Sequence, residues 1–234
     1  GTRVISLVHR QVMSGLLGLL TGGFISIEDS EQILRAIRST PKDKPIDMIV
    51  HTPGGLVLAT DQIAKALAKH PAKVTLFVPH YAMSGGTLLG LASDEIVMDD
   101  NAILGRVDSQ VYGMPAVSIR KAVAQKDKDE VSDRTLVMDD VSEKAINQSK
   151  QTLKELLQAN KYDKKTIDKI VDELASGKYT HDHPITFQEA KDLGLKVSTE
   201  VPKAVYRFIQ LFPQQRRQQP SVQYIPANDN QESE

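Results

Sequence analysis

Two consecutive stretches of the chain repeat one pattern, in which an apolar run is followed by a corner of small residues and then by a helix. In the first, residues 46–51 predict a strand, a Pro-Gly-Gly corner follows, and a helix is expected from about 56 to 70. In the second, residues 74–78 predict a buried strand, and helical character begins at Gly85. Strands and helices that alternate in this way favour an α/β fold.

Periodicity elsewhere adds further elements around these two units. Strands are expected over residues 2–8, 94–98 and 197–201, and helices over 27–38, within 114–130, and over 132–157, 164–174 and 187–193.

The serine at the second corner, Ser84, is a candidate nucleophile. At a helix N-terminus, unpaired N–H groups and a positive partial charge stabilise an oxyanion. The first corner adds Gly54 and Gly55, which let the backbone approach a ligand closely and present N–H groups to it. Both features also have a purely structural interpretation, since a serine before a helix is commonly its N-cap and paired glycines turn a chain. Their combination favours an acyl-transfer site.

These corners carry a resemblance to a known family. His-Thr-Pro-Gly-Gly at 51–55 and Ala-Met-Ser-Gly-Gly-Thr at 82–87 resemble the motifs of the serine dehydrogenase proteinase family, within the wider Clp protease/crotonase superfamily. The resemblance extends from near the N-terminus to about Val201. It implies an α/β Clp protease/crotonase-like spiral of ββα units, with Ser84 as nucleophile and an oxyanion hole formed by Gly54, Gly55 and Gly85.

A serine hydroxyl needs a positioned base, and the resemblance offers two kinds. The Clp proteolytic subunit has a histidine in the stretch after the serine helix, whereas this chain has none near Asp108. The related signal peptide peptidase A uses a lysine that precedes or begins a long helix, which makes Lys144 the expected base and Lys121 the alternative. A lysine acts as a base only where burial lowers its pKa. The neighbours that favour such burial of Lys144 are Val141, Ala145 and Ile146.

Three carboxylates are candidates for orienting the base, namely Asp108, Asp139 and Asp140. Asp108 is preferred, with a turn-capping role as the alternative. It lies in Gly-Arg-Val-Asp-Ser-Gln, where similar families carry Gly-Pro-Val-Asp-Pro-Gln, so Arg106 and Ser109 take the places of two prolines.

The remaining candidate bases are histidines, namely His51, His80, His181 and His183. His181 and His183 are two residues apart and suggest a metal site, but no third ligand is evident. A structural turn is favoured, and the resemblance includes a similar His-Asp-aromatic-Pro-Ile motif that suggests a structural or subunit-contact role. We therefore predict neither a metal nor a cofactor.

The leading functional hypothesis is a serine peptidase, specifically an endopeptidase, in which Ser84 attacks a peptide carbonyl and Lys144 shuttles the proton. A crotonase-like acyl-CoA enzyme is one alternative, because the superfamily binds thioester carbonyls in the same amide hole. A non-catalytic scaffold that keeps the fold and assembles with a partner is the other.

Composition narrows the range of partners. A length of 234 residues suffices for one α/β core. The formal net charge of −1 gives no basic excess that would attract nucleic acid or an anionic membrane. The absence of cysteine excludes disulfides and thiol catalysis and is compatible with the cytoplasm. No apolar run reaches the roughly 18 residues of a membrane span, so membrane association is expected only through a segment upstream of Gly1.

The chain is predicted to form one peptidase domain over residues 1–212 and a flexible tail over 213–234. The segments 16–20 and 205–212 are unusually apolar for solvated edges, and such patches are commonly buried between subunits. The resemblance implies rings or stacked oligomers, so we predict a homo-oligomer whose contacts include Phe208 and Phe212. Internal packing of both segments is the alternative.

Overall fold

A parallel five-stranded sheet forms the centre of the computed structural model, which describes residues 1–10 and 23–212. Its strands, in order across the sheet, are β1 (Arg3–Val8), β2 (Ile46–His51), β3 (Val74–Val78), β5 (Glu95–Met98) and β9 (Val197–Ser198). Neighbouring strands are all parallel. The loops that follow them therefore meet at one edge of the sheet, which is where α/β proteins place their sites.

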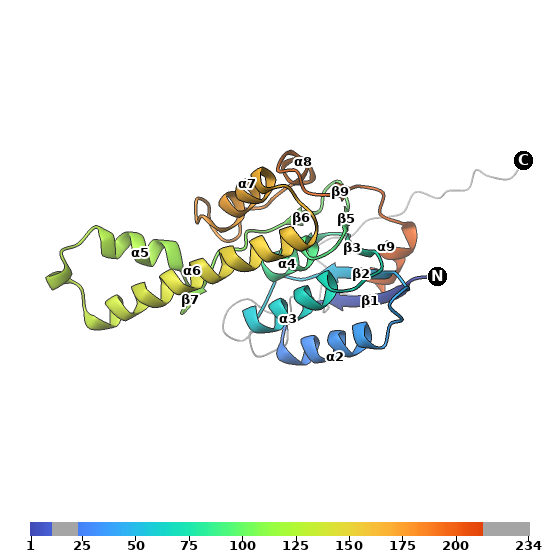
Figure 1. Cartoon of the computed structure of the whole chain (residues 1–234), viewed down its shortest axis with the longest axis horizontal. Coiled ribbons are helices and arrows are strands. Elements are labelled where there is room, and N and C mark those ends of the chain that lie inside the picture. The colour runs from blue at the N-terminus through green and yellow to red at the C-terminus, as the bar shows by residue number, and fades with distance from the viewer. Residues whose placement is uncertain (11–22, 213–234) are drawn as a thin grey trace, which may run out of the picture.

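Helices pack around this sheet. They are α2 (Ile27–Arg38), α3 (Val57–Ala68), α4 (Gly85–Leu91), α7 (Lys164–Ala175), α8 (Phe187–Asp192) and α9 (Lys203–Gln210). Figure 1 shows α2 and α3 beside the β1–β2 end of the sheet, and α7 and α8 beside its β5–β9 end. Side-chain caps define where several of these helices begin, as the Ser26–Asp29 capping box does for α2.

A second, narrow layer of short strand segments follows the main sheet. β4 (Tyr81–Ala82) pairs in parallel with β6 (Ile103–Leu104). Single bridges join Ile25 to Gly55, Thr52 to Ala82, and Leu104 to Ile185. Successive units thus contribute a long strand to the main sheet, a short segment to this layer, and then a helix. The ββα arrangement expected from the sequence is confirmed.

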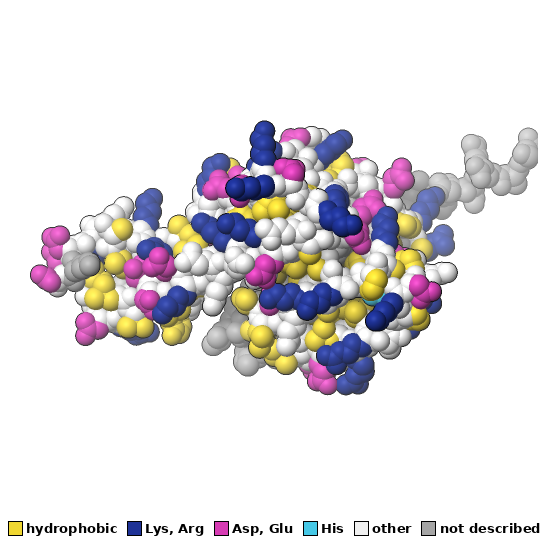
Figure 2. Space-filling model, viewed as in Figure 1, with side chains coloured by type: hydrophobic (Ala, Val, Ile, Leu, Met, Phe, Trp, Pro, Cys, Tyr) yellow, Lys and Arg dark blue, Asp and Glu magenta, His cyan; other side chains and the backbone are white. Residues whose placement is uncertain are grey.

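An arm extends from this body (Figure 1). It consists of the hairpin β7 (Gln110–Val111) and β8 (Met114–Pro115), α5 (Ala116–Ala124), a 3-10 turn (Lys128–Glu130) and the first half of α6 (Asp133–Ala159). A small apolar cluster of Val111, Ala116 and Ile119 holds α5 against α6. The other end of α6 inserts Leu153, Leu156 and Leu157 into the main core. The space-filling view shows the arm as a separate lobe of the surface (Figure 2).

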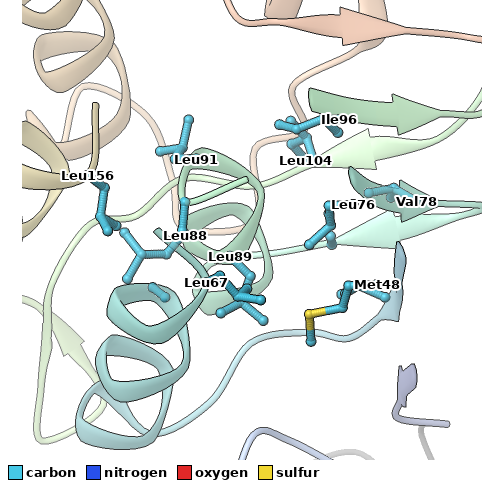
Figure 3. Packing of buried hydrophobic residues seen from close by; sticks show 14 of the residues in the cluster. Met48, Leu67, Leu76, Val78, Leu88, Leu89, Leu91, Ile96, Leu104 and Leu156 are labelled. Carbon is cyan, nitrogen blue, oxygen red and sulfur yellow. The ribbon is translucent and has the colours of Figure 1, made fainter. Parts of the chain in front are cut away.

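The short helix α4 lies at the centre of the main core, and every one of its residues is buried. Leu89 lies next to Leu67 of α3, and Leu88 points toward Leu156 of α6 (Figure 3). Truncating one such leucine to alanine typically costs about 2–5 kcal/mol. The residue at the start of α4 is therefore held on an element that has little freedom to move.

The long elements match the sequence predictions closely, as do the short helix α8 and the short strand β9 within its predicted range. The two-residue strands β4, β6, β7 and β8 and the helix α9 were not predicted. The predictions for segment 16–20 and for the tail 213–234 lie outside the described residues. Within residues 1–10 and 23–212, none of the helices combines the length and apolar character that a bilayer crossing requires.

Candidate active site

Ser84 occupies a strained corner between β4 and α4. Its backbone has φ 49° and ψ −111°, in the positive-φ region that residues with a side chain rarely adopt. Ser84 is the N-cap residue of α4, as the structural interpretation expected, but its hydroxyl makes no capping hydrogen bond to the helix. The corner presents Oγ at the start of a buried helix, as strand-to-helix nucleophile turns do.

Two glycines bring the loop after β2 against this corner. Gly54 has φ 109°, and a Cβ there would lie 2.8 Å from Ser84 Cβ. A Cβ at Gly55 would lie 2.3 Å from backbone atoms of Ile25. Ile25 fixes the loop by donating its N–H to Gly54 O at 2.7 Å and accepting the N–H of Leu56 at 2.9 Å. Only glycine permits this approach, so the corner has a structural need for both residues.

The three predicted oxyanion-hole glycines are not equivalent. Gly54 donates its N–H to Thr52 Oγ1 at 3.2 Å and does not line the cleft beside Ser84. Gly55 and Gly85 do line that cleft. Neither of their N–H groups has an acceptor among the residues that the structure describes. The geometry therefore favours Gly55 and Gly85 as the two donors to an oxyanion.

Asp108 and His181 form a hydrogen-bonded pair in the same cleft. His181 Nδ1 lies 2.7 Å from Asp108 Oδ1, and Gln110 Nε2 donates to Asp108 Oδ2 at 3.1 Å. The bond to the buried Asp108 is the main cause that raises the pKa of His181, and burial of the ring partly opposes it. A carboxylate at Nδ1 favours the tautomer with its proton there, which leaves the Nε2 lone pair to accept a proton.

The cleft has a volume of about 480 Å³ and brings together residues from distant parts of the chain. Ser84 comes from the start of α4, Asp108 from the loop after β6, and His181 from the loop after α7. No hydrogen bond between Ser84 and His181 is present among the contacts of the described residues. In enzymes without substrate, such bonds are often long and tighten when the substrate binds.

The structure does not bring Lys144 into this cleft. The Lys144 side chain is 67% exposed and pairs with Asp140, four residues earlier on α6. The predicted burial of Lys144 is therefore wrong, because Val141 is itself exposed and Ile146 packs toward the arm cluster. Lys121 is exposed on α5 and does not line the cleft either.

The other predicted acids and histidines lie elsewhere. Asp139 lies 3.7 Å from Arg120 Nε in the arm, so neither it nor Asp140 orients a base in the cleft. His51 is buried at the end of β2, where its Nδ1 bonds His9 O at 2.9 Å and its ring stacks on His80. His183 stacks on Tyr179 at 4.4 Å between ring centroids, so the two histidines of the 181–183 motif have different contacts.

The two residues that stand in place of prolines hold their turn through side-chain contacts. Ser109 Oγ donates to Ala145 O at 2.8 Å and lies 2.7 Å from Ser149 Oγ. The buried Arg106 donates from Nη1 to the backbone oxygen of Glu173 at 2.7 Å and to its carboxylate at 2.9 Å. These contacts tie the Asp108 segment to α6 and α7.

Sequence reasoning considered His181 as a base but preferred a structural turn, and it missed one wall of the cleft. That wall is a stripe on α6 made by Ala145, Gln148, Ser149 and Thr152. The stripe has helical spacing, so periodicity could have found it. No local pattern links His181 to Asp108, because 73 residues separate them in the sequence.

The fold and the cleft together define a class of protein, an α/β spiral of ββα units with a serine at the start of a buried helix. The chain belongs to the family of ClpP-like SDH-type serine proteinases, whose family model matches residues 1–234.

Two proteins of Methanocaldococcus jannaschii are similar over nearly the whole chain. The uncharacterized protein MJ0137 is 53% identical over 230 residues, which cover 98% of this chain and 80% of that protein. The uncharacterized protein MJ1495 is 52% identical over 227 residues, which cover 97% of this chain and 77% of that protein.

Proposed function

We propose that this chain is a serine peptidase in which Ser84 is the nucleophile, His181 the general base and Asp108 the residue that orients it. Ser84 Oγ attacks the carbonyl carbon of a peptide bond while its proton passes to His181 Nε2. The N–H groups of Gly55 and Gly85 donate hydrogen bonds to the developing oxyanion. His181 then gives the proton to the leaving amine, and an acyl-enzyme forms on Ser84.

Water completes the reaction by the same route. His181 takes a proton from water, the resulting hydroxide attacks the acyl carbonyl, and the proton returns to Ser84 Oγ as the carboxylic acid leaves. Asp108 stabilises the imidazolium that forms in each half-reaction and keeps its Nδ1 proton in place.

The single observation that carries this proposal is the Asp108–His181 pair in the cleft of Ser84, with Nδ1 to Oδ1 at 2.7 Å. The family supports peptidase chemistry at the serine. The exposure of Lys144 argues against the Ser-Lys mechanism expected from the sequence, because a lysine acts as a base where it is buried, and Lys144 neither is buried nor lines the cleft.

Labelling with a fluorophosphonate tests the nucleophile and the base together. We expect wild-type protein to be labelled at Ser84, Ser84→Ala to remain unlabelled, and His181→Gln to react at least about a thousandfold more slowly. Lys144→Ala is the matched control and should react at the wild-type rate. The rates of peptide cleavage by these variants should rank in the same order as their labelling rates.

Two outcomes would contradict the proposal. Loss of labelling in Lys144→Ala with normal labelling in His181→Gln would assign the base to the lysine. Absence of labelling in the wild-type protein, with turnover of acyl-CoA thioesters, would favour the crotonase-like alternative.

A further inference from the structure

The cleft continues beyond Ser84 as a groove between α3 and α6. Apolar side chains form its walls near the serine, namely Leu56, Val57 and Leu88, with Ala145 opposite. Further along, the lining residues become polar and include Asp61 on α3 and Thr152 on α6. The groove thus offers both apolar walls and hydrogen-bonding groups.

Asp61 supplies a carboxylate to this polar end. Its side chain is 25% exposed, and Thr152 Oγ1 lies 3.5 Å from Oδ1 across the groove. Lys65 Nζ lies 2.9 Å from Oδ2, but Lys65 does not line the cleft and so reaches Asp61 from outside it. Among the described residues that line the cleft there is no lysine or arginine, and the two carboxylates are Asp61 and Asp108.

A second polar group lies beside the serine. Thr60 is 1% exposed, and its Oγ1 has no hydrogen-bond partner among the described residues. This atom would lie 2.7 Å from a Cβ built on Gly85, so it is next to the Ser84 corner, and Thr60 also lines the cleft. A buried hydroxyl without a partner is costly, and a ligand group that reaches it would remove that cost.

We propose that this groove binds a basic side chain of the substrate, an arginine or lysine on the acyl side of the cleaved bond. The aliphatic stem of such a side chain packs against Leu56, Val57 and Leu88, and its cationic end reaches Asp61. Charge-assisted hydrogen bonds to one carboxylate supply the preference, since none of the described residues that line the cleft is a lysine or arginine, and Lys65 reaches Asp61 from outside it. This inference rests on the proposed function, because it assumes that Ser84 attacks the adjacent carbonyl.

The test compares two peptides that differ only in charge, with arginine or the neutral isostere citrulline before the cleaved bond. Wild-type protein should cleave the arginine peptide with a kcat/KM at least about tenfold higher, as one hydrogen bond to a charged group supplies. Asp61→Asn should reduce that ratio to near one while it still cleaves the citrulline peptide, which shows that the variant is folded.

Lys65→Ala is the decisive partner variant. Because it removes the cation that competes for Asp61, it should raise the arginine-to-citrulline ratio, in the direction opposite to Asp61→Asn. If the Asp61–Lys65 pair were only structural, both variants would change the cleavage of both peptides alike. Glu155 Oε2 also lies 3.9 Å from Lys65 Nζ, but Glu155 does not line the cleft. Glu155→Gln should therefore leave the arginine-to-citrulline ratio unchanged.

The result separates this inference from the proposed function. A wild-type ratio near one, with normal fluorophosphonate labelling of Ser84, would overturn the basic preference and leave the peptidase intact. Equal shifts in Asp61→Asn and Lys65→Ala would overturn it as well. Failure of the wild-type protein to label would overturn the proposed function itself.

Discussion

Asp108 uses both of its carboxylate oxygens in the cleft, and this fixes how activity should depend on pH. The hydrogen bond to Asp108 raises the pKa of His181, and His181 acts as a base only when it is neutral. The kcat/KM should therefore rise with pH as His181 loses its proton. Asp108→Asn removes the anion, so the pKa of His181 should fall toward its ordinary value and the acid limb should move to lower pH.

The same substitution should lower the plateau of kcat/KM by roughly 10⁴-fold, because an amide does not hold the required tautomer. Gln110→Ala, which removes the second partner of Asp108, is the control and should shift the profile much less. An acid limb that stays in place in Asp108→Asn would show that another group titrates.

A second hydrogen-bonded series of carboxylate, imidazole and hydroxyl ends on the loop after β2 that carries Gly54 and Gly55. His9 Nε2 lies 3.4 Å from Asp29 Oδ2, and His9 Nδ1 lies 2.8 Å from Thr52 Oγ1. Thr52 Oγ1 in turn accepts the N–H of Gly54. Burial, the largest cause, lowers the pKa of His9, which favours a neutral ring that accepts the Thr52 proton. Thr52 Oγ1 is then left to accept from the loop.

Thr52→Val tests this series, because valine keeps the shape but removes the acceptor of the Gly54 N–H. We expect kcat to fall about tenfold with KM nearly unchanged. The free energy of unfolding should fall by about 1–3 kcal/mol, because buried polar groups lose their partner. Thr52→Ser should restore both quantities. A rise in KM alone would mean that the series positions substrate rather than the loop after β2.

At the scale of elements, the loop that carries His181 is clamped by the segment that carries Asp108. The Arg106 guanidinium lies 4.2 Å above the ring of Tyr179, and that ring stacks on His183. Backbone bonds between Leu104 and Ile185, both at 2.9 Å, fix the end of the loop. One short segment therefore sets the positions of both Asp108 and the loop that carries His181.

Arg106→Lys keeps the charge but loses the planar fork and the stacking. We expect kcat to fall roughly 10- to 100-fold, because small displacements of a base are costly, and the acid limb of kcat/KM to move to lower pH as the His181–Asp108 bond loosens. Lys178 is the other cation near Tyr179, and its side chain is exposed. Lys178→Ala should therefore change neither kcat nor the acid limb of kcat/KM. A fall in thermal stability with an unchanged pH profile would assign Arg106 a structural role only.

The sequence predicted those parts of the fold and of the candidate site whose residues lie close together in the chain. Both glycine and serine corners are complete within a few residues, so Ser84 and the glycines could be proposed from their own motifs. The two-residue strands β4 and β6 are too short for any periodicity, although they complete the ββα units.

The burial predicted for Lys144 was wrong for a different physical reason. Ala145 and Ile146 are close to Lys144 in sequence but lie on other faces of the helix, because only residues three and four apart share a face. Val141 does share the face of Lys144, but it is itself exposed. The face of α6 that meets the cleft begins at Ala145, and Lys144 points away from it to solvent. His181 reaches Asp108 only because α6 and α7 fold back along the body, which no local pattern records.

At the scale of the whole molecule, large apolar side chains remain exposed on the arm, at α3 and at the C-terminal end of α9. Figure 2 shows hydrophobic surface on the arm and on the body. The exposed residues include Val57, Leu58, Val137, Val141, Leu211 and Phe212. Solvated surfaces with such groups favour association.

The end of α9 is firmly attached on its inner side, which makes its outer side a defined surface. Arg10 donates from Nε to Phe212 O at 2.6 Å and from Nη2 to Ile209 O at 3.0 Å. Tyr206 donates its hydroxyl proton to the carboxylate of Asp99. Phe208 is half-buried and packs on Phe212 at 5.2 Å between ring centroids, while Phe212 is 36% exposed.

We therefore expect a homo-oligomer with α9 in its contacts, and Phe212→Asp is the sharper of the two phenylalanine tests. A charge at this exposed position opposes burial between subunits, whereas Phe208→Asp also disturbs packing within the chain. Light scattering should show the wild-type protein as an oligomer at micromolar concentration and Phe212→Asp as a smaller species. Gln210→Asp places the same charge on the same helix at an exposed polar position and should leave the mass unchanged. A wild-type protein that is monomeric and cleaves peptide, or a Phe212→Asp variant that keeps its full mass, would show that α9 serves the fold of one chain alone.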